Sequence, residues 1–235
     1  MGLNNFYICL QINPNMKKIY LLATAFSLLF TINSNAQMLG SGTPSDPYQV
    51  TTCDELQQLQ NNLSAYYVLM NDIDCSQTQT GGGPWGSTGF TPIGTDTLNS
   101  FKGNFNGHCF AIKNLYINNP TLTNVGIFGF TDGAKISSVN VINAVVIGGT
   151  CTGIIIGDKH SSTLDTTFVS GYVNGQDLTG GIVGKCDNYQ GPNTQITNSF
   201  SKAVVAGHNY VGGVVGQITT LPGWLVITSK LLCPL

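Results

Sequence analysis

The sequence predicts an all-β protein with the fold of a parallel β-solenoid, in which short strands from successive coils stack on one another. Three observations predict this fold. The chain has 235 residues, of which 29 are Gly and only 9% are charged, a composition typical of many turns and short strands. A glycine-rich segment occurs four times at a nearly constant interval. A second apolar segment occurs at matching places between these copies.

The charge composition excludes several classes of protein. The chain has nine Lys, no Arg and a formal net charge of −2, whereas a nucleic-acid-binding protein needs a basic face. Coiled coils and helical bundles are solvated by many Lys and Glu residues, and this chain has a single Glu. Its 42% hydrophobic content is typical of a chain that forms a core rather than of a disordered one.

Residues 1–36 are expected to be an N-terminal extension followed by a secretory signal peptide. The basic segment Met16–Lys18 precedes the 12-residue apolar run Ile19–Phe30, and small residues then lead to a cleavage site after Ala36. A transmembrane helix needs about 20 apolar residues, so this run is too short to be one. Because the signal is complete from Met16, we expect translation to start there. The remainder is predicted to be secreted or displayed at the cell surface, without a transmembrane helix.

Residues 37–124 are predicted to form an N-terminal cap and the first coils. Thr51 or Thr52 can cap a short helix that runs through Leu59, because Asp54 and Glu55 would lie in its first turn, where negative charge is favourable. Short strands and corners are expected to follow at Tyr66–Leu69, Phe90–Gly94, Phe101–Gly107 and Ala111–Ile117.

Residues 125–216 contain the four glycine-rich segments, whose last Gly residues lie 28, 27 and 32 residues apart. The structural glycines of this repeat are Gly126, Gly129, Gly153, Gly157, Gly180, Gly181, Gly184, Gly212, Gly213 and Gly216. Between them lie Ile136–Gly148, Leu164–Gly175 and Ile196–Gly207, and the last two align without a gap, so that Leu164 matches Ile196 and Phe168 matches Phe200.

A unit of about 27 residues fits one coil of a parallel β-solenoid. One unit cannot bury its apolar face alone, but a stack of units can. Gly and Asn tolerate a positive φ at corners, so Asn106-Gly107 and Asn174-Gly175 are expected to be such corners. A propeller blade would need 40–50 residues, and a β-sandwich would lack the fixed period, so both alternatives are weaker.

The alternation of GGIVG at Gly180–Gly184 and VGGVVG at Val211–Gly216 with an ITNSF-type segment resembles the GLUG motif of secreted bacterial surface proteins. The upstream sequence resembles the region that often precedes such repeats, and the resemblance covers about residues 40–216. The upstream matches are Asp46–Tyr48, Asn71–Asp74, Pro92–Gly94 and Phe101–Leu115.

This resemblance implies a right-handed parallel β-helix with residues 53–62 as its N-terminal cap. Members of the family are commonly large and adhesin-like, and their repeats are scaffold without assigned catalytic residues. The chain departs from the motif at 152–157, which lacks the usual second Gly. It also departs after Gly216, where an irregular apolar tail, residues 217–235, replaces the polar cap that a solenoid end needs. An unusual cap strand and a truncated or frameshifted reading frame both explain this tail, and the second is favoured.

Three groups of residues are candidate sites. Asp72 and Asp74 lie two apart and would share one face of a strand, where they are weak candidates for Ca²⁺; hydrogen bonding to a corner backbone is the favoured alternative. Asp158, His160 and Asp165 are candidates for an acid–base group. They are expected in an irregular connector, however, where solvated polar residues are ordinary.

Cysteine and histidine give the remaining candidates. His108 beside Cys109 suggests a thiol–imidazole pair, but adjacent strand residues point to opposite faces, which disfavours it. Six cysteines remain after removal of the signal, and Cys53 with Cys75 is the best candidate for a disulfide because these two flank one short segment. Small buried side chains are the alternative for all six, and none has the spacing of a zinc site.

The sequence therefore predicts a non-catalytic module for surface display, adhesion or ligand binding, with no cofactor. Outward-facing Thr, Ser and Asn side chains would bind a glycan or a protein, and no nucleic acid. A β-helix polysaccharide lyase or glycoside hydrolase is the alternative. It is disfavoured because such enzymes need clustered carboxylates and, for anionic glycans, a cationic residue, whereas this chain has no Arg and one Glu. A structural spacer within a longer surface protein is the second alternative.

Overall fold

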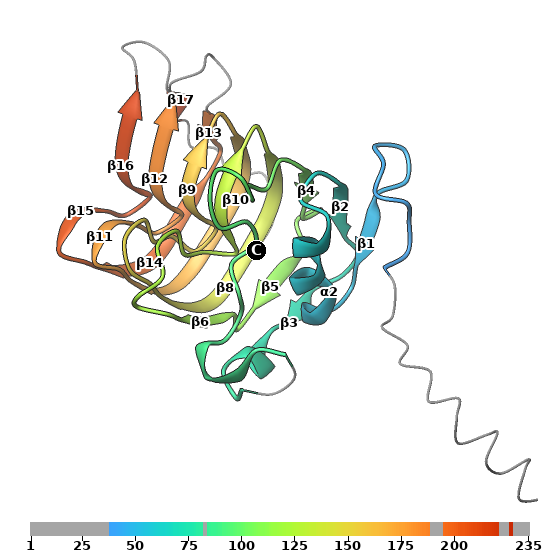
Figure 1. Cartoon of the computed structure of the whole chain (residues 1–235), viewed down its shortest axis with the longest axis horizontal. Helices are drawn as coiled ribbons and strands as arrows, with labels where there is room; N and C mark the ends of the chain where they lie inside the picture. The colour runs from blue at the N-terminus through green and yellow to red at the C-terminus, as the bar shows by residue number, and fades with distance from the viewer. Residues whose placement is uncertain (1–37, 82–83, 189–194, 221–225, 228–235) are drawn as a thin grey trace, which may run out of the picture. The chain divides into compact units, whose positions relative to one another are not determined.

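The computed structural model describes residues 38–81, 84–188, 195–220 and 226–227, and in this part the chain is a parallel β-solenoid (Figure 1). All pairs between its named strands run parallel, and about four turns stack, so the predicted fold class is confirmed. The expected signal peptide and most of the apolar tail at 217–235 lie outside the described residues. No described helix has the length and hydropathy needed to cross a membrane.

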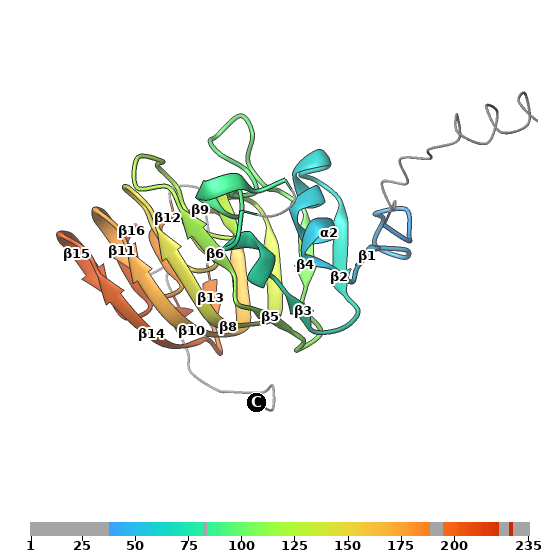
Figure 2. The same ribbon diagram turned by 90° about the horizontal axis from the view of Figure 1, so that it is seen from below.

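A short helix, α2 (Cys53–Gln58), lies at the N-terminal end of the stack, beside the first strands (Figure 2). Thr52 begins it with a capping box, in which its hydroxyl accepts from the Glu55 backbone N–H while the Glu55 carboxylate accepts from the Thr52 N–H. The helix buries Leu56 against the core and continues into the 3₁₀ helix η1 (Leu59–Asn61). This agrees with a cap at residues 53–62.

The larger sheet holds two adjoining ladders of strands. The first ladder has the order β1 (Tyr48–Val50), β2 (Tyr66–Leu69), β4 (Asn104–Asn106), β8 (Lys135–Ile147), β10 (Thr163–Asn174), β13 (Gln195–Thr197) and β17 (Val226–Ile227). Strands β8 and β10 are long enough to continue into the second ladder, which adds β3 (Ile73–Asp74), β5 (Ala111–Lys113), β6 (Tyr116–Asn118) and β14 (Phe200–Ala206). Leu164 pairs with Ile196 and Phe168 with Phe200, as the sequence alignment predicts.

A second sheet is built from strands that begin within or just after the glycine-rich segments. It has the order β16 (Val215–Thr220), β12 (Val183–Asn188), β9 (Ile156–His160) and β7 (Phe128–Asp132). Two short strands, β11 (Asp177–Gly180) and β15 (Asn209–Gly212), pair beside it. Single 3₁₀ turns at η2 (Ser76–Thr78) and η3 (Gly86–Thr88) complete the described elements; the sequence did not indicate them.

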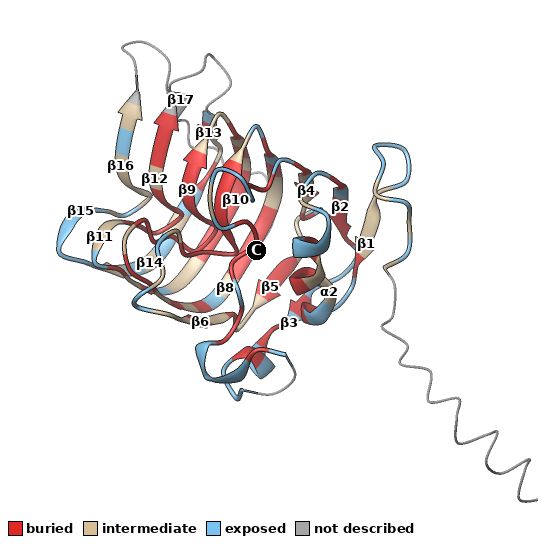
Figure 3. Cartoon of the chain, in the orientation of Figure 1, coloured by how far each residue is buried: buried red, intermediate tan, exposed pale blue. Residues whose placement is uncertain are grey.

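The core is formed by equivalent apolar residues of successive coils. Phe105, Ile136, Leu164 and Ile196 occupy one row of the first ladder and are almost completely buried. Each such side chain contributes about 1.5–3 kcal/mol by leaving water. Figure 3 shows buried residues along β9, β10 and β12, and exposed ones on β15, at the C-terminal edge of the stack.

The corners differ from the sequence prediction. Gly107 and Gly175 do not have a positive φ, so the expected left-handed corners at Asn106-Gly107 and Asn174-Gly175 are wrong. These glycines are close to neighbouring backbone instead: a Cβ on Gly107 would lie 2.3 Å from the Ser138 carbonyl oxygen. Several left-handed residues occur in each coil at equivalent places, and most of them are not glycine; one such series is Asn124, Cys151, Leu178 and Tyr210.

Candidate functional site

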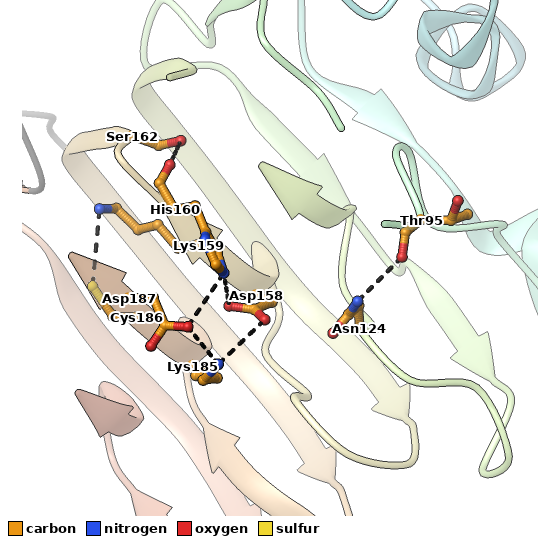
Figure 4. A network of polar contacts seen from close by, with 9 residues as sticks. All are labelled: Thr95, Asn124, Asp158, Lys159, His160, Ser162, Lys185, Cys186 and Asp187. Atoms are coloured by element: carbon orange, nitrogen blue, oxygen red, sulfur yellow. Dashed lines mark hydrogen bonds and ion pairs between the residues drawn. The ribbon is translucent and has the colours of Figure 1, made fainter. Parts of the chain in front are cut away.

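Four charged side chains meet on the second sheet, where β9 carries Asp158 and His160 and β12 carries Lys185 and Asp187 (Figure 4). Residues two apart on a strand share a face. The parallel register pairs Lys185 with Asp158 and Asp187 with His160, so one face receives all four side chains. We call these four residues the Asp–His–Lys cluster.

The cluster has buried carboxylates and partly exposed cations. His160 Nε2 lies 3.2 Å from Asp158 Oδ1 and 3.3 Å from Asp187 Oδ2. Lys185 Nζ contacts Asp187 Oδ2 and lies 3.8 Å from Asp158 Oδ2. The Asp158 and Asp187 side chains are 10% and 4% exposed, against 29% for His160 and 25% for Lys185. The cations therefore lie between the carboxylates and solvent.

Electrostatics within the cluster favour the charged forms of its bases. The neighbouring Asp158 carboxylate raises the pKa of His160, against the opposing effect of burial. Burial alone would lower the pKa of Lys185, but the hydrogen bond to Asp187 and the charge of Asp158 raise it overall. The Phe130 ring packs against the His160 imidazole with 4.6 Å between centroids and covers one side of it.

Three polar atoms of the cluster make no hydrogen bond of good geometry, although they are buried: Asp158 Oδ1, His160 Nε2 and Asp187 Oδ1. A buried polar group without a partner costs about 1–3 kcal/mol. The ion pairs offset part of this cost. The cluster thus keeps buried potential ligand atoms of Asp158, His160 and Asp187 within 4.8 Å of one another.

The expectation that Asp158, His160 and Asp165 lie in an irregular connector is wrong. Asp158 and His160 are in strand β9, and Asp158 is buried. Asp165 lies elsewhere, on β10, where its carboxylate accepts from the Thr197 hydroxyl and the Asn198 amide. The three residues therefore do not form one site.

Sequence reasoning missed Lys185 and Asp187. They lie 27 residues after Asp158 and His160, which is the repeat interval at this point of the chain. Matching charged residues across that interval would have identified the group. The tripeptide Asp158-Lys159-His160 does not look buried by itself, because its neighbours in the adjacent coil supply its counter-charges.

Lys159 points away from the cluster, since it lies between Asp158 and His160 on the same strand. It is completely buried, and its Nζ lies 4.0 Å from Cys186 Sγ. Burial lowers the pKa of Lys159 to about 8, and burial also raises the pKa of the Cys186 thiol. Cys151 and Cys186 are the free thiols among the described residues, and both are buried.

The other candidate groups have structural partners. Asp72 pairs with Lys113 at 2.8 Å and accepts from the Ala111 N–H. Asp74 accepts from the Ser76 N–H and the Asn114 side chain, so both carboxylates make the corner contacts that the alternative interpretation expects.

Two cysteine candidates also have definite places. The structure joins Cys53 to Cys75 by a disulfide, the pairing that the sequence favoured. Cys109 is disulfide-bonded as well, and it lies with His108 in a left-handed turn rather than in a strand. His108 and Cys109 therefore do not form a thiol–imidazole pair.

A groove of about 340 Å³ crosses the corners that follow β8, β10 and β14. Its lining includes the polar residues Asn174, Gln176 and His208 together with Gly148 and Gly175. The Gln176 side chain donates to the Pro120 backbone carbonyl, and the backbone N–H of His208 donates to the backbone carbonyl of Gln176. The groove is thus shaped by consecutive coils and presents amide, imidazole and backbone hydrogen-bonding groups.

Known proteins show similarity over most of the chain. No model of a known protein family matches it. It is 36% identical over 191 residues to halomucin of Haloquadratum walsbyi, a match that covers 76% of this chain. It is 35% identical over 92 residues, 38% of its length, to a candidate Gly-rich membrane protein of Evansella cellulosilytica. The chain spans only 2% and 10% of the lengths of these two relatives.

The fold also occurs in a solved structure. The crystal structure of a candidate immunoglobulin A1 protease from Bacteroides ovatus superposes with a TM-score of 0.56 and covers 81% of this chain and 69% of that one. The two sequences are 20% identical, so the likeness shows a shared fold and nothing about activity.

Proposed function

We propose that the chain is a non-catalytic β-solenoid module of an exported surface protein and that it binds a glycan or protein ligand. The fold and the names of the relatives fit a surface-protein module. The observation that carries the proposal is the 36% identity with halomucin over three quarters of the chain. The resemblance of the repeats to GLUG motifs supports the same role.

The groove between Gln176 and His208 is the proposed ligand surface. Amide and imidazole groups there can exchange hydrogen bonds with the hydroxyls of a neutral sugar. We therefore expect a neutral oligosaccharide rather than a charged polymer.

A non-catalytic role is supported by the position of the carboxylates. Glycoside hydrolases place two carboxyl groups across a substrate cleft, about 5–10 Å apart. A second, smaller groove lies between Ser64 and Lys135. Among the described residues, those that line either groove include no Asp or Glu. Asp158 and Asp187 are held in ion pairs outside both grooves.

The proposal is tested by screening the full chain against a glycan array and a set of matrix proteins. We expect binding by the wild-type chain and a loss of roughly tenfold or more in Gln176→Ala, because a buried ligand group would lose its partner. Gln79→Ala, an exposed glutamine in another turn, is the matched control and should bind like the wild type.

The alternatives give different results. A structural spacer would bind no ligand in either screen. A lyase or hydrolase would release unsaturated or reducing ends from a polysaccharide panel, and this turnover would contradict the non-catalytic role.

A further inference from the structure

We propose that Asp158, His160 and Asp187 form a binding site for a divalent first-row transition-metal ion, with Zn²⁺ as the best fit. This site goes beyond the proposed ligand-binding function, since it lies outside the groove. Its ligands come from two neighbouring strands, β9 and β12, so a bound ion would join consecutive coils.

The spacing of the three donors fits a metal ion. One ligand atom from each residue lies within 4.8 Å of the others. Zn²⁺ binds imidazole nitrogen and carboxylate oxygen at about 2.0–2.2 Å, so two ligands of a tetrahedral ion lie about 3.3–3.5 Å apart. The distances from His160 Nε2 to the carboxylate oxygens, 3.2 Å to Asp158 and 3.3 Å to Asp187, are close to this spacing.

The hydrogen bonding of the three donor atoms also supports a metal site. Asp158 Oδ1, His160 Nε2 and Asp187 Oδ1 are buried and make no hydrogen bond of good geometry; His160 Nε2 and Asp158 Oδ1 have only their ion pairs, and Asp187 Oδ1 has no partner among the described residues. The Asp187 side chain is only 4% exposed, so water does not readily satisfy it. Structural carboxylates such as Asp74 instead accept hydrogen bonds from their own corner. Asp187 Oδ1 therefore keeps lone pairs for a ligand, and a bound ion would take the place of the proton on His160 Nε2.

The donor types select the class of ion. One imidazole and two carboxylates form the mixed N/O set that suits Zn²⁺ and its neighbours in the first transition row. Ca²⁺ takes six to eight oxygen ligands, more than these residues provide. His160 is partly exposed, so solvent can supply a further ligand on that side.

Lys185 is the competitor for the site. Its ammonium group contacts Asp187 Oδ2 and lies 3.8 Å from Asp158 Oδ2, where it balances the charge of the two carboxylates. The side chain is 25% exposed, so it can turn to solvent when an ion binds. Removing this ammonium should therefore strengthen metal binding, whereas it would only destabilise a simple salt-bridge network.

The test titrates the full chain, freed of metal with a chelator and carrying no affinity tag, with Zn²⁺ by calorimetry and with Co²⁺ by visible absorption. We expect one ion per chain and the cobalt spectrum of a four- or five-coordinate N/O site. Asp187→Asn and His160→Gln should each weaken Zn²⁺ binding by at least roughly tenfold. Loss of a residue that only hydrogen-bonds a metal ligand already weakens binding by about tenfold or more, and loss of a ligand itself should cost at least as much. Lys185→Met should tighten it several-fold.

The controls are His108→Asn, an exposed imidazole elsewhere, and Asp74→Asn, a carboxylate of a corner; both should bind Zn²⁺ like the wild type. Circular dichroism checks the fold of each variant, and if Asp187→Asn does not fold, the more exposed His160→Gln decides. The proposal is overturned if the wild type binds no stoichiometric ion or if folded His160→Gln binds as tightly as the wild type. A thiolate-to-cobalt band would also overturn it, since it would place the ion at a cysteine.

Discussion

At the scale of single residues, the repeat glycines are required by neighbouring backbone and not by left-handed corners. A Cβ on Gly184 would lie 2.4 Å from the Thr152 nitrogen and 2.5 Å from the Cys151 carbonyl carbon, both in the preceding coil. Gly213 belongs to the same motif, but a Cβ there would meet nothing within 4 Å. Two glycines at different positions of one motif therefore differ in their tolerance of a side chain.

This difference predicts the effect of two substitutions within the motif. Gly184→Ala should lower the free energy of unfolding by about 1–3 kcal/mol or more, because the methyl group forces backbone apart. Gly213→Ala should change it by less than about 0.5 kcal/mol. Urea unfolding followed by circular dichroism measures both, and equal effects would show that close approach is not the reason for the glycines.

At the scale of elements, polar side chains at the corners connect each strand to the next coil. Asp165 on β10 accepts from the Thr197 hydroxyl at the end of β13 and from Asn198 at the following left-handed corner. Burial alone would raise the pKa of Asp165, but these hydrogen bonds and those from Thr166 lower it overall from 3.8. The ionised carboxylate is thus the form that stabilises the corner.

The lowered pKa gives a prediction about pH. The stabilisation by Asp165 is present above the ordinary aspartate pKa and is lost as the pH falls through the lowered value in the folded chain. Asp165→Asn should therefore cost about 0.5–1 kcal/mol near neutral pH, a value reduced by the partial exposure of the carboxylate. The difference from wild type should vanish in acid. Unfolding curves from pH 2 to 7 measure it, and a constant difference would contradict the assignment.

The elements also show which features the sequence could predict. The period of the glycine segments and the pairing of Leu164 with Ile196 were predictable, because stacking preserves equivalent positions. The corners were not predictable. Position 107 requires glycine because another coil comes close to it, and not because its φ is positive. The Asp–His–Lys cluster was only half visible, since its carboxylates and cations come from two coils and each looks solvated alone.

At the scale of the whole molecule, stability depends on neighbours along one axis. Among the described strands, β14, β15 and β16 each pair on one side only. Phe200 is 45% exposed and Ile218 is 40% exposed, while their counterparts one coil earlier, Phe168 and Cys186, are buried. Among the described coils, the one that contains β14, β15 and β16 is therefore less protected from solvent than the coil before it.

Hydrogen exchange should report this gradient. Amides of β8 and β10, with strand partners on both sides, should exchange slowest, and those of β15 and β16 fastest, because solenoids open from their edges. Mass spectrometry of peptic peptides from the full chain measures the order. Uniform protection across the coils would mean that the stack unfolds as one unit.

The open surroundings of Gly213 have an evolutionary consequence. At positions such as Gly184, glycine comes under selection because another coil packs against it, so each coil's sequence is constrained by its neighbour as well as by its own shape. A duplicated coil inserted within the stack would have neighbours on both sides, and both would require glycine at the close contacts. The sequence of a coil at an edge is free to change on its open side. Divergence between copies should therefore accumulate first in glycines that face no neighbour.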